Sequence, residues 1–120
     1  MVSVLIVDDD KFIHKVLERI IELRGHEVVG HAHNGAEAVE KFVALEEKPD
    51  IILMDERMPV MRGAAATREI LERDNNTKVL FVSADESIRP AAMEAGAVGF
   101  LTKPIRSAQL FEAIEKYVSE

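Results

Sequence analysis

The sequence predicts an α/β protein in which a doubly wound, five-stranded parallel sheet lies between two layers of helices. Short apolar runs alternate with longer segments whose apolar residues recur at helical spacing. Because the short runs have no polar face, each strand must be covered on both sides, which is typical of parallel sheets. A chain of 120 residues, 48% hydrophobic and 31% charged, suits one globular domain over residues 1–120.

Each predicted strand is a brief apolar run that ends in or just before a polar residue. The first is continuous and apolar apart from Ser3, and the acidic run 8–10 ends it. The third follows Pro49 and reads Ile-Ile-Leu-Met before Asp55, and Lys103-Pro104 closes the fifth. The five predicted strands are 2–7, 27–33, 50–55, 79–83 and 98–102.

The predicted helices lie between these strands and carry ordinary start and stop signals. Gly25 ends the first helix, the turn Asn34-Gly35 precedes the second, and a loop from Met58 to Gly63 precedes the third. Pro90 is suited to the first position of the fourth helix. The predicted helices are 12–23, a second with inward-facing Ala38, Val39, Phe42 and Leu45, then 64–73, 91–95 and 107–118.

Charge and composition exclude several classes of function. With 15 Lys and Arg against 22 Asp and Glu, the net charge is −7, which disfavours direct binding to nucleic acid. The cysteine count of 0 excludes disulfides, thiolate zinc sites and a cysteine nucleophile. We find neither a secretory signal nor an apolar stretch long enough to span a bilayer, so the sequence predicts a cytoplasmic protein without membrane association.

Polar side chains from four separate strands are expected to meet at one edge of the sheet. Asp8 and Asp9 follow the first strand, Asp55 ends the third, Ser83 ends the fourth and Lys103 follows the fifth. The carboxyl ends of parallel strands share an edge, and ligands bind in the crevice there. Any one of these residues is ordinary at a strand end, whereas the whole set indicates a site.

The chemistry of this set favours a phosphoryl acceptor. Three carboxylates raise one another's pKa values unless a cation lies between them. Hard oxygen ligands favour Mg²⁺, with Mn²⁺ as an alternative. A lysine and a hydroxyl can hold phosphoryl oxygens, and one carboxylate can be the nucleophile that forms an aspartyl phosphate.

The sequence resembles the receiver domains of two-component response regulators, the CheY-like family. The resemblance covers essentially the whole chain and rests on the order and spacing of several short pieces. These pieces are Leu5-Ile6-Val7-Asp8-Asp9, Met54-Asp55 with Met58-Pro59 and Gly63, Phe81-Val82-Ser83-Ala84, Ala95-Gly96-Ala97, and Phe100-Leu101-Thr102-Lys103-Pro104. It implies a flavodoxin-like fold with strand order 2-1-3-4-5.

The resemblance also implies a role for each residue of the site. Asp55 looks like the phospho-acceptor and Lys103 like the phosphate-binding lysine. Asp9, Asp55 and the backbone carbonyl of Arg57 look like direct Mg²⁺ ligands, and Asp8 like a ligand through water. In this family such a domain accepts a phosphoryl group from a sensor histidine kinase or a phosphotransfer protein.

A switch and an output surface are implied in the same way. Ser83 resembles the family's switch hydroxyl, and Phe100 stands where the family carries a rotating aromatic residue. Phosphorylation is expected to draw Ser83 toward the phosphoryl group and to turn Phe100 inward. The responsive surface is then the fourth helix, fifth strand and fifth helix, where an effector binds. The Lys103-Pro104 bond is cis in the family.

Kinase docking is expected on an apolar rim beside the pocket. The first helix has two neighbouring apolar rows, which is more than packing on one sheet face requires. The residues expected to contact the kinase are Phe12, Ile13, Val16, Pro104 and Ile105. The competing interpretation makes Phe12 and Val16 core residues.

Several local features carry their own expectations. Asp10 is interpreted as the cap of the first helix. Glu56 and Arg57 depart from the family's usual pattern after the acceptor, and Asp85 is expected to face Arg57 across the pocket mouth.

His14 is interpreted as a surface residue near the pocket rim. His31 and His33 share a strand face near His26, where a solvated edge is favoured over a zinc site because a third ligand is not evident.

Two rival functions and the oligomeric state complete the predictions. An aspartyl-phosphate phosphohydrolase commonly carries a second acid two residues after the nucleophile, where this chain has Arg57. A flavin or nucleotide domain would need a glycine-rich phosphate loop in place of the acidic run 8–10. An effector domain cut away from a larger regulator stays an open alternative. We expect a monomer, because Val98 and Gly99, and the last helix with Glu112, Glu115 and Lys116, lack the charges of regulators that dimerise through the last two helices.

Overall fold

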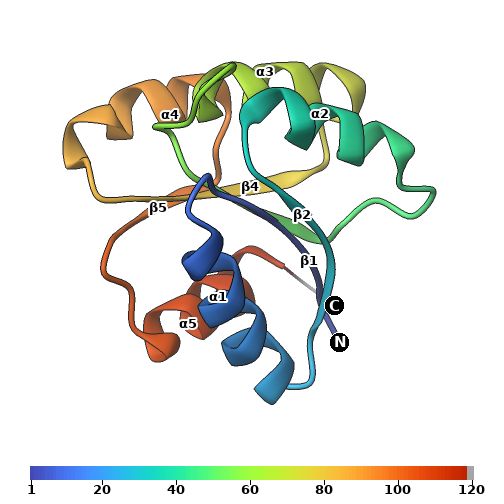
Figure 1. Cartoon of the computed structure of the whole chain (residues 1–120), viewed down its shortest axis with the longest axis vertical. Helices are drawn as coiled ribbons and strands as arrows, with labels where there is room; N and C mark the ends of the chain where they lie inside the picture. The colour runs from blue at the N-terminus through green and yellow to red at the C-terminus, as the bar shows by residue number, and fades with distance from the viewer. Residues whose placement is uncertain (119–120) are drawn as a thin grey trace.

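The computed structural model describes residues 1–118 and has three layers (Figure 1). The five strands form one parallel sheet in the order β2-β1-β3-β4-β5. The predicted fold class and strand order are therefore confirmed. The strands are β1 (Ser3–Val7), β2 (Glu27–Ala32), β3 (Ile51–Met54), β4 (Lys78–Ser83) and β5 (Gly99–Thr102). The helices are α1 (Lys11–Leu23), α2 (Gly35–Ala44), α3 (Gly63–Arg73), η1 (Glu86–Ile88), α4 (Arg89–Ala95) and α5 (Ser107–Tyr117).

The sheet divides the core into two layers, and a different set of helices covers each of them. Figure 1 shows α2, α3 and α4 on one face of the sheet and α1 with α5 on the other. Alternate strand residues serve the two faces: Leu5 and Phe81 pack with the first group of helices, and Ile6 and Leu80 with the second. These four side chains are fully buried, so the strands are apolar on both faces, as the sequence indicated.

Two details differ from the sequence expectations. The short 3₁₀ helix η1 lies where no element was predicted, and the Asp85 carboxylate caps it by accepting a hydrogen bond from the Ser87 backbone N–H at 3.0 Å. Element ends otherwise agree within a few residues, with β3 ending at Met54 and so leaving Asp55 just beyond the strand. The predicted domain 1–120 extends two residues past the described range.

The connection between β3 and α3 is tightly folded. Val60 has a φ of 69°, and the Met61 N–H donates to the Pro59 carbonyl at 2.7 Å, which makes a γ-turn. At the start of α3, Gly63 lies so close to the Asp55 carbonyl that a Cβ atom would collide with the backbone. A glycine is therefore required for the loop to return beneath Asp55.

The Lys103-Pro104 bond is cis, as the family resemblance implied. Within residues 1–118, the helices are all too short or too polar to cross a bilayer.

Candidate functional site

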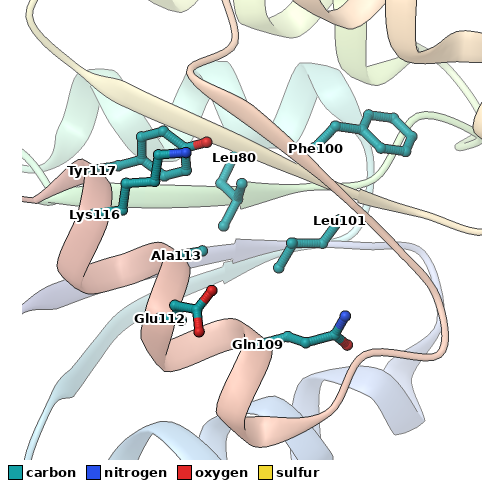
Figure 2. Close-up of a pocket in the computed structure, with 8 residues that line it drawn as sticks. All are labelled: Leu80, Phe100, Leu101, Gln109, Glu112, Ala113, Lys116 and Tyr117. Carbon is teal, nitrogen blue, oxygen red and sulfur yellow. The ribbon is translucent and has the colours of Figure 1, made fainter.

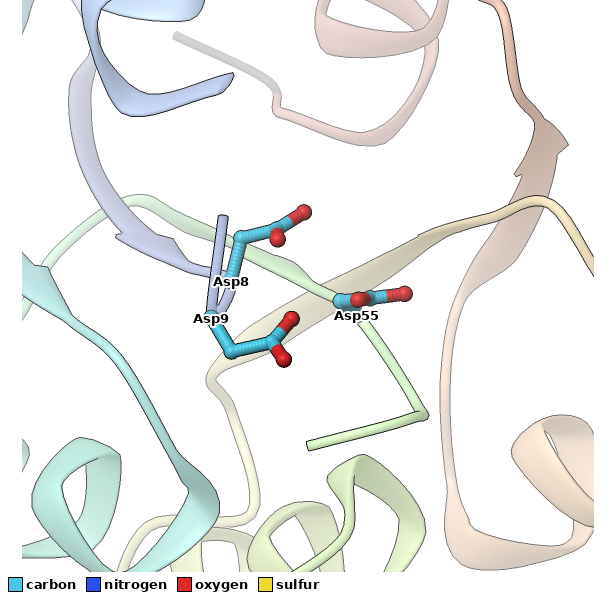
Figure 3. Close-up of side chains that lie close together, drawn as sticks. All are labelled: Asp8, Asp9 and Asp55. Atoms are coloured by element: carbon cyan, nitrogen blue, oxygen red, sulfur yellow. The ribbon is translucent and has the colours of Figure 1, made fainter. Parts of the chain in front are cut away.

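Three carboxylates converge at the carboxyl edge of the sheet, as predicted from the strand ends (Figure 3). Asp8 and Asp9 follow β1, and Asp55 follows β3, the strand that neighbours β1 in the sheet. Ligand oxygens of the three side chains lie within 4.8 Å of one another. Asp8 and Asp55 are buried and Asp9 is exposed, so the group opens to solvent on one side.

Asp55 has a strongly perturbed acidity. Burial, together with the neighbouring charges of Asp8 and Asp9, raises its pKa from the ordinary 3.8 to about 6, against the opposing effect of Lys103. Because the pKa of Asp55 rises, burial and like-charge repulsion outweigh the lowering effect of the Lys103 charge. A cation between the carboxylates would relieve this repulsion, so the donor set fits a hard divalent ion such as Mg²⁺.

Lys103 supplies positive charge to the same site. Its Nζ lies 2.7 Å from an Asp8 carboxylate oxygen and 3.7 Å from an Asp55 carboxylate oxygen. The backbone N–H of Lys103 donates to the Ser83 carbonyl at 2.9 Å, which fixes the start of the loop after β5. The lysine therefore reaches the site from the far side of β4.

A surface pocket of about 390 Å³ lies over Asp55, and Ser83 and Lys103 of the predicted site also line it. Ser83 is buried at the end of β4, and its hydroxyl accepts a hydrogen bond from the Asp85 backbone N–H at 3.2 Å. The residues that line the pocket are Asp55, Arg57, Ser83, Ala84, Asp85 and Lys103.

Arg57 and Asp85 form the expected ion pair across this pocket. Hydrogen bonds from Ser87 and from Arg57 lower the pKa of the Asp85 carboxyl to about 2. The Asp85 carboxylate also caps η1, so the pair connects the loop after β3 to the start of the η1–α4 segment.

Two acids beside the site accept hydrogen bonds from helix N-termini and are not part of the carboxylate group. The Asp10 carboxylate accepts a hydrogen bond from the Phe12 N–H at 2.9 Å and caps α1, as predicted. Glu56 is buried, and its carboxylate accepts from the Ala64 N–H at 2.8 Å at the start of α3. The unusual acid after Asp55 is thus accounted for as a helix cap from outside the helix, a role that the sequence analysis missed.

Phe100 takes an inward position in this structure. Its side chain is only 7% exposed, and its ring is parallel to that of Phe81 at 6.4 Å between centroids. The Arg89 guanidinium lies 4.8 Å from the Phe100 ring centre and donates to Glu86 at 2.7 Å. Glu86 also accepts a hydrogen bond from the Thr102 hydroxyl. Phe100 therefore lies inward against Phe81, and the dependence of this position on phosphorylation stays a prediction.

Leu101 leaves β5 in a different direction from Phe100, toward α5 (Figure 2). A pocket of about 180 Å³ lies between β5 and α5. Its lining residues are Leu80, Phe100, Leu101, Gln109, Glu112, Ala113, Lys116 and Tyr117. The Tyr117 side chain lies over Gly99, where a Cβ atom would approach the hydroxyl oxygen at 2.5 Å and ring carbons at 2.7–2.8 Å.

The predicted docking residues form an apolar groove beside the acidic site. Phe12 is 69% exposed and Val16 38%, so the alternative that both are core residues is wrong. The groove has a volume of about 450 Å³, and all five predicted docking residues line it. The full lining is Phe12, Ile13, Val16, Leu17, Ile20, Val82, Ala84, Lys103, Pro104 and Ile105.

The expectation that His14 is a surface residue is wrong. Its side chain is buried, with His14 Nε2 2.7 Å from the Asp8 carbonyl oxygen and Nδ1 2.8 Å from His31 Nδ1. Burial lowers the pKa of His14. His14, Leu17 and Ile21 follow one another at three- and four-residue spacing, so His14 shares the core-facing side of α1, which the sequence pattern alone does not distinguish from the second apolar row.

Comparison with known proteins assigns the chain to a family. The family model for the response regulator receiver domain matches residues 4–115 of this chain. A chemotaxis protein CheY from Thermotoga maritima is 44% identical over 115 residues, which is 94% of each chain. The chain therefore belongs to the response regulator receiver domain family, as the resemblance indicated.

A solved structure and a longer relative extend the comparison. The crystal structure of the CheX-CheY-BeF3-Mg+2 complex from Borrelia burgdorferi superposes with a TM-score of 0.90 at 32% identity, covering 98% of this chain and 90% of that one. The positive alginate biosynthesis regulatory protein of Pseudomonas aeruginosa is 39% identical over 95% of this chain, which spans 46% of that protein.

Proposed function

We propose that this protein is a phosphorylation-controlled signalling module in which Asp55 accepts a phosphoryl group. The observation that carries the proposal is the convergence of Asp8, Asp9 and Asp55 within 4.8 Å, with the Lys103 ammonium 3.7 Å from Asp55. This arrangement pairs a carboxylate nucleophile with charges on the side where phosphoryl oxygens would lie.

Mg²⁺ is the proposed cofactor, held by the carboxylates of Asp9 and Asp55 and the Arg57 carbonyl, with Asp8 acting through water. The bound ion supplies charge neutralisation for the phosphoryl oxygens. The raised pKa of Asp55 supports a cation in this position.

The proposed reaction is a transfer from a phosphohistidine of a sensor kinase or a phosphotransfer protein. An Asp55 carboxylate oxygen forms a bond to phosphorus as the phosphorus–nitrogen bond of the donor breaks, and the electron pair of that bond stays on the imidazole. Lys103 and Ser83 contact the transferred oxygens. Hydrolysis of the acyl phosphate then releases inorganic phosphate and restores the Asp55 carboxylate. Any catalytic activity therefore acts on the protein's own modification.

The groove beside α1 is the proposed docking surface for the donor. Its position fits this role, because Lys103 borders both the groove and the pocket over Asp55. Phe12 and Val16 would contact the helical bundle that carries the donor histidine, together with Ile13, Pro104 and Ile105.

The output is proposed to pass through α4, β5 and α5 to an effector in the cytoplasm. Arg89, Glu86 and Thr102 hold the region around Phe100 in its inward state. A phosphoryl group on Asp55 would attract the Ser83 hydroxyl. Movement of Ser83 would reach this region through Asp85, whose backbone N–H donates to that hydroxyl.

The alternative of a receiver cut from a larger regulator is supported by the Pseudomonas aeruginosa relative, which is about twice as long as the matched region. A phosphohydrolase stays the second alternative. Incubation with acetyl phosphate and Mg²⁺ separates the functions: a single phosphoryl adduct supports the receiver, and continuous phosphate release without an adduct supports the hydrolase.

A further inference from the structure

Three histidines gather beside the first β-strand, outside the acidic site. His14 comes from α1, His31 from β2, and His33 from the turn that follows β2. The His14 ring centre lies 4.9 Å from that of His31 and 4.4 Å from that of His33. His31 and His33 were predicted to share a strand face without a third ligand, and the fold supplies His14 from a different element.

Each ring has one nitrogen hydrogen-bonded to a group that orients metal-binding histidines in proteins. His14 Nε2 lies 2.7 Å from the Asp8 carbonyl oxygen. His31 Nε2 lies 3.2 Å from a Glu18 carboxylate oxygen, and His33 Nδ1 lies 3.2 Å from a Glu37 carboxylate oxygen. A backbone carbonyl or a carboxylate on one ring nitrogen fixes the tautomer and leaves the other nitrogen as a ligand.

The remaining nitrogens of two rings already face each other. His14 Nδ1 and His31 Nδ1 are 2.8 Å apart and share one proton in a hydrogen bond, and an ion that binds both nitrogens would release this proton to solvent. An ion between them would require only a small separation, since zinc–imidazole bonds are about 2.0–2.1 Å long. The side chains of His31 and His33 are 30% and 40% exposed, so solvent reaches the cluster.

We propose that His14, His31 and His33 form a binding site for a divalent transition metal ion of the Zn²⁺ class, distinct from the acidic Mg²⁺ site. His14 Nδ1, His31 Nδ1 and His33 Nε2 are the ligands, and water completes the shell. Imidazole suits Zn²⁺, whereas the carboxylates around Asp55 suit Mg²⁺, so the two sites select different ions.

Two movements are needed to close this site, the small separation of the His14 and His31 rings and a turn of His33. Among the described residues, Asp8, Asp9 and Asp55 are the only three potential metal-binding residues whose ligand atoms all lie within 4.8 Å of one another. The ligand nitrogens of the three histidines therefore do not all lie this close together. His33 must therefore turn toward the other two rings with the Glu37 carboxylate following it, which the partial exposure of both side chains allows. Once closed, the ion would tie α1 to β2 next to the Asp8 backbone.

The test is Zn²⁺ titration of the untagged full chain by calorimetry, with Mg²⁺ in excess to occupy the acidic site. We expect one Zn²⁺ per chain and a rise in melting temperature. His31→Gln and His33→Gln should each weaken binding by at least roughly tenfold, and Glu18→Gln by a comparable factor, as for other residues that orient metal ligands. His33→Gln is the informative variant if His14→Gln fails to fold.

Two controls separate this site from the others. His26→Gln removes a histidine outside the cluster, one whose Nδ1 accepts from the Val2 N–H at 3.0 Å, and should leave the Zn²⁺ affinity unchanged. Asp9→Asn with Asp55→Asn should also leave it unchanged. Absence of one-to-one binding, or binding lost in the aspartate variants and retained in His31→Gln and His33→Gln, overturns the proposal.

Discussion

Arg57 and Asp85 face each other as an ion pair across the mouth of the pocket that holds Asp55. Arg57 is 63% exposed at its side chain, so the pair contributes little to stability. Its position matters more under the proposed function, because water would pass this mouth to attack a phosphoryl group on Asp55.

Arg57→Ala is therefore expected to speed dephosphorylation by several-fold, since opening the pocket admits water along the line of attack. The loss of phosphoaspartate after removal of acetyl phosphate can be followed by mass spectrometry. Asp85→Ala should act in the same direction because it removes the other half of the pair. An unchanged or slower rate in Arg57→Ala would reject the idea.

Asp55→Asn is expected to stabilise the folded protein at neutral pH. The folded-state pKa of about 6 exceeds the ordinary 3.8, so wild type loses stability as the pH rises from about 4 through 6. Asparagine carries no charge and avoids this loss, which amounts to about 1–2 kcal/mol after allowance for solvent screening.

Urea unfolding of both proteins between pH 4 and pH 8, without divalent ions, checks this expectation. The two free energies of unfolding should converge near pH 4 and separate above pH 6. Added Mg²⁺ should stabilise wild type more than Asp55→Asn, because the variant loses one ligand. A difference that is constant across this pH range would show that the Asp55 charge is not its cause.

Phe12→Ala is expected to slow phosphoryl transfer from the cognate kinase while leaving acetyl phosphate labelling normal. At 69% exposure, Phe12 contributes little to the core, so the melting temperature should change by no more than a few degrees. Val43→Ala is a matched control, because Val43 is 53% exposed on α2, away from the groove. Equal slowing in both variants would remove the support for docking at Phe12.

Arg89→Ala should release Phe100 from its inward position. The guanidinium covers the Phe100 ring and pairs with Glu86, so the variant loses both contacts. NMR of the unphosphorylated variant should show shifted Phe100 ring signals.

Phosphorylation of wild type should shift NMR signals along α4, β5 and α5. Shifts confined to Asp55 and its neighbours on phosphorylation would contradict the proposed output surface.

The fold was predictable because its strands are apolar on both faces and end at polar residues. The meeting of Asp8, Asp9 and Asp55 followed from the shared edge of parallel strands. Glu56 could not be placed, because its partner Ala64 is defined only once the loop after β3 folds back beneath Asp55.

The position of His14 was the other failure of the sequence analysis. Helix α1 carries apolar residues on two sides, with Phe12 exposed and Leu17 buried, and the sequence does not say which side faces the sheet. Burial of His14 follows from that orientation, and its partner His31 comes from a strand that only the tertiary fold brings near.

The most direct measurement for the proposed function is mass spectrometry of the intact protein after incubation with acetyl phosphate and Mg²⁺. Wild type is expected to gain a single phosphoryl group that maps to Asp55 and is lost when Mg²⁺ is withheld. Asp55→Asn, with the same fold by circular dichroism, should gain none. Normal adduct formation in Asp55→Asn, or no adduct in folded wild type, would contradict the assignment of Asp55 as the phospho-acceptor.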